Sequence, residues 1–321
     1  MTVIAADVGG SKTLLDGFSN RTDSHHPQQF DNHAHPDFDT VLAQFLAHNP
    51  TLDPTQALLV LAIAGPVVDR QYCQMTNLPW IIDARALQQR FGFARVVLLN
   101  DLEATAFAMP GAPMAPFLRS LNGKPLNFDK RVAVMSIGTG LGEALLLPDQ
   151  GQGRVVLSSE GGHKSFAPFD EAGARLLSRY LSHSPLPPSW EEWFSGSGLP
   201  HLFQALFPDD PPLGSADITR LAANPASHSA RCIEFFSRGL IAEAGNIALQ
   251  YWSEGGVIIS GGVAQHIQQW LGKPALLQQF SQKTQYRPWL QQVPIALCSN
   301  TDAALLGAAE FGWQHHPLAG T

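Results

Sequence analysis

The sequence predicts an α/β fold of two lobes, each of which begins with a strand, a glycine turn and a second strand. These hairpins are "TVIAADVGGSKTLLDGF" at residues 2–18 and "RVAVMSIGTGLGEALLL" at residues 131–147. Both place glycines beside a hydroxyl residue between apolar strands, a shared pattern that indicates structural duplication. A length of 321 residues is long for one hydrophobic core and sufficient for two.

Apolar strands and helices alternate after the first hairpin. Apolar residues at helical spacing predict a helix at residues 37–49, and a second helix at residues 82–92 is closed by Gly92. Continuous apolar runs predict buried strands at residues 57–67 and 94–101. This alternation indicates a sheet covered by helices on both faces.

The second lobe is expected to begin within the loop-rich segment 109–130. After its hairpin, the sequence predicts a long helix at residues 228–252 and a buried strand at residues 256–260. A capped, alanine-rich helix is predicted near the end of the chain, at residues 300–313.

The charge balance argues against nucleic acid and against an anionic membrane as partners. Net charge is −7, 15% of the residues are charged, and no run of Lys or Arg is present. An anionic small molecule remains compatible with this balance, because backbone N–H groups and a metal ion can bind phosphate without net positive charge.

The sequence also predicts a cytoplasmic protein. Its first residues, "MTVIAADVGG", lack the basic segment and the long apolar stretch of a signal peptide. No apolar run approaches the roughly 20 residues that a membrane-spanning helix needs. The cysteines Cys73, Cys232 and Cys298 are far apart in the sequence, which indicates reduced structural thiols.

The two glycine turns match neither common nucleotide-binding motif. In "GTGLG" the third glycine comes one residue earlier than in the dinucleotide-binding pattern, and a strand follows in place of a helix. Each turn alone is explained by a tight hairpin. Two turns at the starts of two lobes favour phosphate loops, because glycine lets the backbone approach a phosphate closely. The residues concerned are Gly9, Gly10, Ser11, Gly138, Thr139 and Gly140.

Carboxylates stand where two of the expected strands end. Asp7 closes the first strand beside the first glycine turn, a position suited to a hydrated magnesium ion. Asn100 and Asp101 come where a strand gives way to a helix. This pair fits two interpretations, a helix cap or a carboxylate at the edge of a ligand crevice.

Short segments along the chain carry a family resemblance. They are "DVGGSKT", "AIAGPV", "MTN", "NDLEATAFAMP", "GTGLG", "EGGHKSFAP", "FSGSGL", "GGVIISGG" and "LLGAA". In order and spacing these segments resemble the bacterial glucokinase family from Asp7 to Ala309, and "NDLEA" and "EGGH" are the most specific of them. The family consists of hexokinase-like sugar kinases, so the resemblance implies a two-lobed actin-like ATPase fold with a ribonuclease H-like core.

The resemblance implies ATP with Mg²⁺ as the phosphoryl donor. Asp7 to Ser11 and Gly138 to Gly140 match the two phosphate loops of the family, and Gly261-Gly262 match the glycines that contact adenosine. Asp7 would hold Mg²⁺ through water. The family usually has Thr-Asn after "DVGG", whereas this chain has Ser11 and Lys12. Lys12 either reaches a phosphate oxygen or is a solvated strand residue.

The resemblance also implies glucose as the acceptor. Asn100 and Asp101 match the sugar-binding Asn and the catalytic Asp of the family. Asp101 would accept the proton of the 6-hydroxyl as the general base. Glu160 and His163 match residues that hold the hydroxyls at positions 1 to 3.

A third sugar-binding carboxylate is expected in "SWEEWFSGSGL". It falls at Glu191, and Glu192 beside it is the alternative. A core histidine is the plainer interpretation of His163, but the "GGHK" turn has no apolar periodicity and favours the sugar site. No cysteine lies near His163 in the sequence, which argues against the zinc motif of a related group of sugar kinases and repressors.

The resemblance implies a discontinuous first domain, because in the family the C-terminal helix packs back onto the first lobe. The expected small domain comprises residues 1–107 plus 300–321. The expected large domain, residues 108–299, carries the second phosphate loop and the adenosine site. Family members often form dimers, so the resemblance allows a homodimer.

Two alternatives to an ATP-dependent glucokinase stay open. One is a kinase with the same site for another acceptor, such as mannose or an N-acetylated amino sugar. The other is a sugar sensor without catalysis, which the intact Asp101 and both phosphate loops argue against.

Overall fold

The computed structural model describes residues 2–21, 24 and 27–315 of the chain. Its contacts divide the chain into two compact units. The first unit comprises Met1–Pro116, Asp149–Ser158 and Asn300–Thr321, and the second comprises Phe117–Pro148 and Ser159–Ser299.

These units differ from the domains expected from the sequence in two segments. Residues 108–116 and 149–158 belong to the first unit, whereas the sequence placed them in the second domain. In the second of these segments, the Arg154 N–H donates to Gln314 Oε1 of the C-terminal helix at 2.8 Å, which ties the segment to the first unit. Residues 316–321 of the expected small domain lie outside the described residues.

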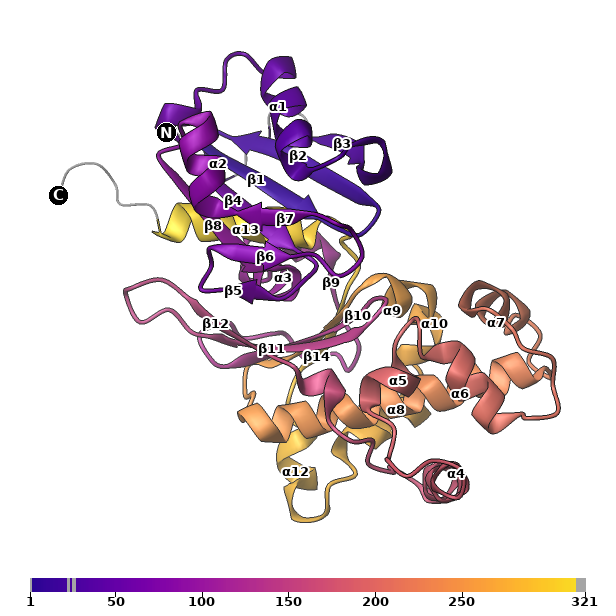
Figure 1. Ribbon diagram of the computed structural model, residues 1–321. Coiled ribbons are helices and arrows are strands. Elements are labelled where there is room, and N and C mark those ends of the chain that lie inside the picture. The colour runs from indigo at the N-terminus through magenta and orange to yellow at the C-terminus, as the bar shows by residue number, and fades with distance from the viewer. Residues whose placement is uncertain (1, 22–23, 25–26, 316–321) are drawn as a thin grey trace. The chain divides into compact units, whose positions relative to one another are not determined.

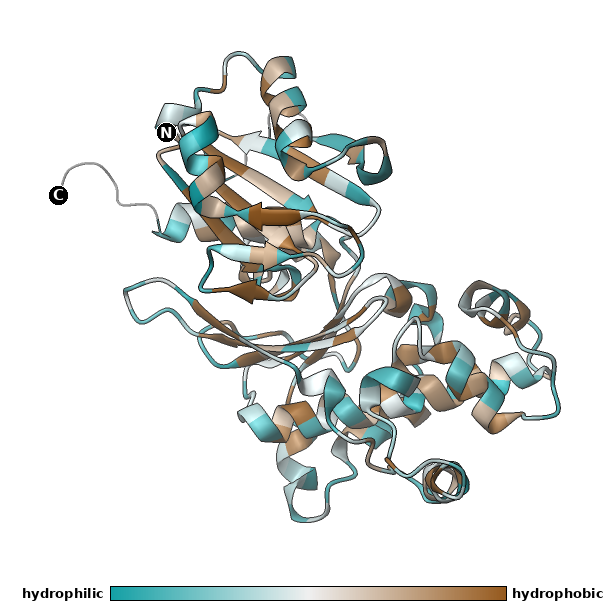
Figure 2. Cartoon of the chain, in the orientation of Figure 1, coloured by the Kyte–Doolittle hydropathy of each residue, from teal (hydrophilic) through white to brown (hydrophobic). Residues whose placement is uncertain are grey.

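A five-stranded sheet forms the centre of the first unit, in the order β3-β2-β1-β4-β8. Strand β1 pairs antiparallel with β2 and parallel with β4, and β4 pairs parallel with β8. Figure 2 shows the central strands of this unit in brown, as expected for strands covered on both faces. The strands are β1 (Thr2–Val8), β2 (Lys12–Phe18), β3 (Gln28–Asp31), β4 (Ala57–Ile63) and β8 (Arg95–Asn100).

Helices cover both faces of this sheet (Figure 1). Helices α1 (Phe38–His48) and α2 (Ala84–Phe91) pack on one face. Helices α3 (Asp101–Ala108) and α13 (Ala303–His315) pack on the other face and against each other. Gly307 of α13 lies so close to α3 that a Cβ there would overlap the Ala104 carbonyl oxygen. This packing fixes α3, the helix that begins with Asp101.

The second unit repeats the pairing pattern of the first. Strand β10 pairs antiparallel with β11 and parallel with β13, and β13 pairs parallel with β14. The duplicated core that the sequence predicts is therefore confirmed. The six-stranded sheet has the order β12-β11-β10-β13-β14-β9. Its strands are β9 (Leu118–Ser120), β10 (Val132–Ile137), β11 (Leu141–Leu147), β12 (Val155–Ser159), β13 (Gly256–Ser260) and β14 (Ile295–Cys298). Its edge strand β12 lies almost wholly within Asp149–Ser158, the segment that the contacts group with the first unit.

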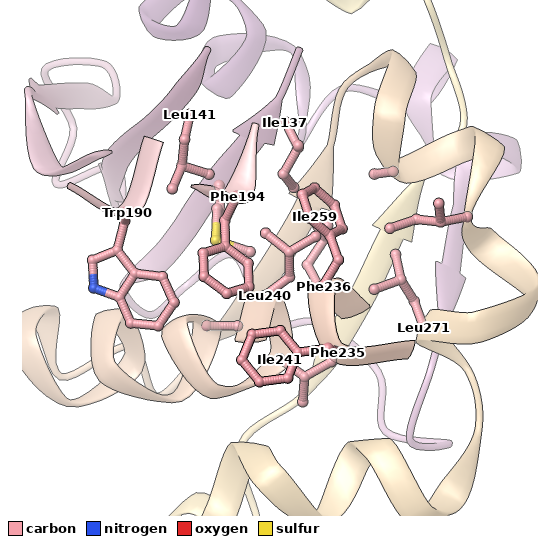
Figure 3. Packing of buried hydrophobic residues seen from close by; sticks show 14 of the residues in the cluster. Ile137, Leu141, Trp190, Phe194, Phe235, Phe236, Leu240, Ile241, Ile259 and Leu271 are labelled. Carbon is pink, nitrogen blue, oxygen red and sulfur yellow. The ribbon is translucent and has the colours of Figure 1, made fainter. Parts of the chain in front are cut away.

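The core of the second unit is rich in aromatic rings. The long helix α8 (His228–Tyr251) places Phe235 and Phe236 against Phe194 and the strand residue Ile259 (Figure 3). Shorter helices of this unit are α4 (Glu171–Leu181), α5 (Trp190–Phe194), α6 (Leu199–Leu206), α7 (Ser215–Leu221), α9 (Gly262–His266), α10 (Gln268–Leu271), α11 (Pro274–Leu277) and α12 (Arg287–Leu290).

Several short elements were not expected from the sequence. They include a three-stranded sheet of β5 (Val67–Val68), β6 (Tyr72–Gln74) and β7 (Ile81–Asp83). The 3₁₀ helices are Asn32–Ala34, Pro54–Gln56, Ala112–Phe117, Gly161–His163, Gln278–Ser281 and Thr284–Tyr286. None of the helices in the described ranges is both long and apolar enough to pass through a membrane.

Candidate active site

The first glycine turn joins β1 to β2 and is fixed by a buried asparagine. The Gly9 N–H donates to the Lys12 carbonyl oxygen at 3.0 Å. Asn32 Nδ2 donates to the Gly9 carbonyl oxygen at 2.9 Å, and Asn32 Oδ1 accepts from Thr13 Oγ1 at 2.7 Å. The Asn32 N–H also donates to the Ser11 carbonyl oxygen at 2.9 Å. Sequence reasoning missed Asn32, because nothing in its own loop marks it.

The second glycine turn, Gly138–Gly140, joins β10 to β11. The Gly138 N–H donates to the Gly140 carbonyl oxygen at 3.0 Å, and Gly196 donates its N–H to the Gly138 carbonyl oxygen at 2.8 Å. Ser197 Oγ donates to the Thr139 carbonyl oxygen at 2.8 Å. The segment that carries Gly196 and Ser197 therefore holds this turn from one side. A Cβ on Gly138 would meet no described atom within 4 Å, so the other side of this residue is open.

The glycine pair after β13 combines a structural requirement with an open position. Gly261 has a φ of 95°, and a Cβ there would overlap the Ile137 carbonyl oxygen. Gly262 begins α9, and a Cβ there would meet no described atom within 4 Å. Only glycine fits the first position, whereas the second leaves its backbone accessible to a ligand.

Charged groups surround Asp7 at the end of β1. Burial, and after it the negative charges of Asp101 and Asp302, raise the pKa of Asp7 to about 6. The positive charge of Lys12 acts in the opposite direction and lowers this pKa. Asp302 was not among the sequence candidates. Within residues 2–21, 24 and 27–315, no group of three or more His, Cys, Asp or Glu is arranged to hold a metal ion. A carboxylate that supplies one hard oxygen and leaves the remaining positions to water and phosphate fits Mg²⁺.

Asn100 and Asp101 occupy different positions at the start of α3. Asn100 is the N-cap, and its Oδ1 accepts from the N–H groups of Leu102 at 3.0 Å and Glu103 at 3.4 Å. Asp101 is the first residue of the helix, and its Oδ1 accepts from the Leu102 N–H at 2.8 Å. Burial raises the pKa of Asp101. Of the two interpretations that the sequence left open, capping is therefore performed chiefly by Asn100, and the role of Asp101 as a carboxylate at a ligand crevice stays a prediction.

Three of the expected sugar-binding residues lie together in the second unit. His163 Nε2 is 3.7 Å from Glu160 Oε2 and 3.8 Å from Glu191 Oε1. The side chain of Glu160 is 91% exposed and that of His163 is 59% exposed, whereas that of Glu191 is 29% exposed. The Leu141 N–H, just after the second glycine turn, donates to Glu191 Oε2 at 2.8 Å. This cluster therefore adjoins the second glycine turn.

The neighbouring glutamate has a different role. Glu192 Oε2 accepts from the Ser189 N–H at 2.6 Å, and the Glu192 N–H donates to Ser189 Oγ at 3.1 Å. This reciprocal pair is a capping box at the start of α5. Glu191, and not Glu192, is the residue that lies beside His163.

The turn that carries Glu160 and His163 packs directly on β11. A Cβ on Gly161 would overlap the carboxylate of Glu143, and a Cβ on Gly162 would overlap the Leu141 carbonyl oxygen. Both glycines of "EGGH" have negative φ, so their backbone conformation does not require glycine. The close approach to β11 does, because it leaves no room for a Cβ at either position.

Asn100 and Asp101 belong to the first unit, whereas Glu160, His163 and Glu191 belong to the second. The phosphate-loop candidates are divided in the same way. Asp7, Gly9, Gly10, Ser11 and Lys12 belong to the first unit, and Gly138, Thr139, Gly140, Gly261 and Gly262 to the second.

The chain is similar to known glucokinases over nearly its whole length. A family profile described as Glucokinase matches residues 4–315. A glucokinase from Nostoc punctiforme is 31% identical over 96% of this chain and 97% of its own length. The crystal structure of a glucokinase from an Antarctic psychrotroph has a TM-score of 0.88 at 28% identity, and covers 97% of this chain and 98% of that one.

A more distant solved structure has the same fold. It is a ROK family glucokinase from Streptomyces griseus in complex with glucose and AMPPNP, with a TM-score of 0.60 at 19% identity over 98% of this chain and 100% of that one. The duplicated sheets and the profile match over residues 4–315 lead to one conclusion. This chain belongs to the glucokinase family and has its two-lobed actin-like ATPase fold.

Proposed function

We propose that this protein transfers the γ-phosphoryl group of ATP to the 6-hydroxyl of glucose. The observation that carries the proposal is Asp101, a carboxylate with a raised pKa at the point where β8 gives way to α3. Strand ends of this kind are where ligand crevices form in α/β sheets. Membership of the glucokinase family supports the choice of reaction.

Asp101 acts as the general base. The oxygen of the 6-hydroxyl forms a bond to the γ-phosphorus, the bond from that phosphorus to the bridging oxygen breaks, and ADP leaves with its electron pair. The proton of the hydroxyl passes to the Asp101 carboxylate. A raised pKa makes this carboxylate a stronger base, and Asn100 supports it by capping α3.

Glu160, His163 and Glu191 bind the other hydroxyls of the sugar. The distances of 3.7 Å and 3.8 Å from His163 to the two carboxylates exceed normal hydrogen-bond lengths. All three side chains therefore keep capacity for sugar hydroxyls. Because Glu191 Oε2 is held by the Leu141 N–H, its Oε1 is the oxygen available to the sugar.

The glycine turns bind the nucleotide. Backbone N–H groups of Gly9, Gly10 and Ser11 and of Gly138, Thr139 and Gly140 contact the phosphates, with the charge of Lys12 close to Asp7. Gly261 and Gly262 contact the adenosine. Bound through water to Asp7, Mg²⁺ would neutralise charge on the phosphates.

The two compact units serve as the two lobes of the kinase. A cytoplasmic location is supported by Cys73 and Cys232, which form no disulfide, as is usual in a reducing compartment. A homodimer is proposed from the family alone, and light scattering on the purified protein tests it.

A coupled assay of ADP release against a panel of hexoses tests the function. Glucose should be the best acceptor, and release should require both Mg²⁺ and sugar. Preference for mannose or for an N-acetylated amino sugar would move the protein to another acceptor class. Sugar binding without ADP release from any acceptor would favour a sugar sensor.

A further inference from the structure

A buried charge cluster lies beneath the turn that carries Glu160 and His163. Lys164 Nζ is 3.0 Å from Glu143 Oε2 and 2.8 Å from Glu243 Oε1. The carboxylates of Glu143 and Glu243 are 0% and 1% exposed, and the Lys164 side chain is 35% exposed. Exposed ion pairs contribute little free energy, but charges as buried as these are costly unless they are paired.

Polar side chains of α8 and the ammonium of Lys283 extend the cluster. Glu243 of α8 accepts from Asn246 Nδ2, and Asn246 Oδ1 accepts from the ammonium of Lys283. Lys164 Nζ also donates to Gln250 Oε1 at 3.3 Å. Glu143 Oε1 is buried and accepts no hydrogen bond within the part of the chain that the structure describes. A buried polar oxygen without a hydrogen-bond partner is uncommon in native structures and calls for an explanation.

The backbone of Lys164 joins two parts of the proposed sugar site. Its N–H donates to the Gly161 carbonyl oxygen at 3.1 Å, within the turn of Glu160 and His163. Its carbonyl oxygen accepts from the Trp190 N–H at 2.9 Å, and Trp190 immediately precedes Glu191. One residue thus connects the turn to the start of α5 while the buried carboxylates hold its side chain.

We infer that Lys164, held by Glu143 and Glu243, is a positioning residue that sets His163 and Glu191 for sugar binding. This inference rests on the proposed function, because it concerns the same site. Lys164 acts through the backbone it holds and contacts no substrate itself. Loss of the anchor should displace the sugar ligands and leave the phosphate loops in place, so glucose affinity should suffer more than turnover.

The charge of Glu143 adds a pH dependence to this anchor. Burial raises the pKa of Glu143 to about 7, against the opposing effect of Lys164. The other charged groups that face the cluster are Glu243, which acts on Glu143 directly, and the Lys283 ammonium, which acts on Glu243. Below about pH 7 Glu143 gains a proton and loses its ionic attraction to Lys164, so glucose binding should weaken there.

Kinetics of Glu143→Gln and Lys164→Met test the inference. In Lys164→Met, the KM for glucose should rise about tenfold to a hundredfold, because a small displacement of binding groups has an effect of this size. The kcat should stay within about threefold of the wild-type value, and the KM for ATP should be unchanged. Glu143→Gln keeps the shape of the side chain and mimics its protonated form. Its KM for glucose should exceed the wild-type value at about pH 8.5 and equal it at about pH 5.5.

Arg238→Met is the matched control, because it breaks a partly buried ion pair of α8 with Asp170 at 3.0 Å. Its KM for glucose and its pH profile should match those of the wild type. If Lys164→Met does not fold, Glu143→Gln decides the question alone. A KM for glucose within about twofold of wild type in Glu143→Gln at every pH would overturn the inference. Wild-type protein without activity on any hexose would instead refute the proposed function.

Discussion

Burial, and after it the negative charge of Asp101, raise the pKa of Asp7 to about 6. Asp7 lies near the end of β1 and Asp101 follows the last residue of β8, within the same unit. Burial raises the pKa of Asp101 as well. The proposed magnesium ligand and the proposed base are therefore coupled electrostatically, so that a change in the charge of one alters the ionisation of the other.

In Asp302→Asn, the decline of kcat/KM for MgATP at acid pH should move to lower pH. Asp302 adds to the effects of burial and Asp101 that raise the pKa of Asp7, so its neutralisation favours the ionised carboxylate. The proposed role of Asp7 in holding hydrated Mg²⁺ requires its ionised form. The kcat/KM for MgATP should therefore decline below pH about 6 in the wild type and only at lower pH in the variant. Asp39→Asn, which neutralises a carboxylate paired with Arg90, is the control and should leave this decline unchanged. If kcat/KM declined at the same acid pH in Asp302→Asn and in the wild type, the role given to Asp7 would be contradicted.

Asn32→Ala should weaken nucleotide binding while sparing sugar binding. The substitution leaves the Gly9 carbonyl oxygen and the Thr13 hydroxyl without their partner, at a cost of about 1–3 kcal/mol in unfolding free energy. The released turn should raise the KM for ATP by about tenfold, because the phosphate loop loses its fixed geometry. Asn49→Ala is the control, because it removes one hydrogen bond to the Phe45 carbonyl oxygen. It should lower the free energy of unfolding without changing the KM for ATP or the KM for glucose. Equal effects of the two substitutions on the KM for ATP would show that Asn32 is only a stabilising residue.

N-acetylglucosamine should be a poor substrate. If Glu160 and His163 hold the hydroxyls at positions 1 to 3, an acetamido group at position 2 removes a hydrogen-bonding partner and adds bulk. The expected loss in kcat/KM relative to glucose is on the order of tenfold to a thousandfold. Parallel measurements with glucose and mannose separate the effect of the acetamido group from that of the hydroxyl orientation. Turnover of N-acetylglucosamine as fast as that of glucose would place the protein among the amino-sugar kinases.

Glu143→Gln should also flatten the dependence of stability on pH. The pKa of Glu143 is about 7 in the folded protein, whereas an exposed glutamate in the unfolded chain has a pKa of 4.5. The folded protein therefore binds more protons between these values, and the free energy of unfolding falls as pH rises through this window. Glutamine cannot titrate, so the difference in unfolding free energy between variant and wild type should change across the window. Urea unfolding of both proteins at the acid and the neutral end of this pH window measures this difference. A difference that stays constant across the window would contradict the raised pKa of Glu143.

The sequence predicts the duplicated core because both hairpins carry long apolar strands with glycines between them. The helix closed by Gly92 is also predicted correctly, and its φ of 76° explains the glycine. The short strands β5, β6 and β7 escape prediction because they have two or three residues each. Strands of this length show no periodicity.

At Asp101 the sequence shows an uncommon local pattern, a polar pair where an apolar strand gives way to a helix, and the structure has that boundary there. The catalytic role of Asp101 stays a prediction. The choice between Glu191 and Glu192 was also open to local reasoning, since Ser189 and Glu192 form the spacing of a capping box. Asn32 and Lys164 could not be found this way. Their roles depend on partners that are distant in sequence, such as Gly9 for Asn32 and Glu243 for Lys164.

Asp101→Asn separates catalysis from helix capping. The structure assigns the capping hydrogen bonds of α3 chiefly to Asn100, so loss of the Asp101 charge should leave the helix intact. Asparagine keeps the size of the side chain but cannot accept the proton of the 6-hydroxyl, and kcat should fall by about 10²-fold or more, the usual scale for general base catalysis. The melting temperature should stay level or rise, because the substitution removes one of two neighbouring buried negative charges. Glucose should still bind, as measured by calorimetry. Near-normal kcat in a folded Asp101→Asn protein would show that Asp101 is not the base and that the proposed mechanism is wrong.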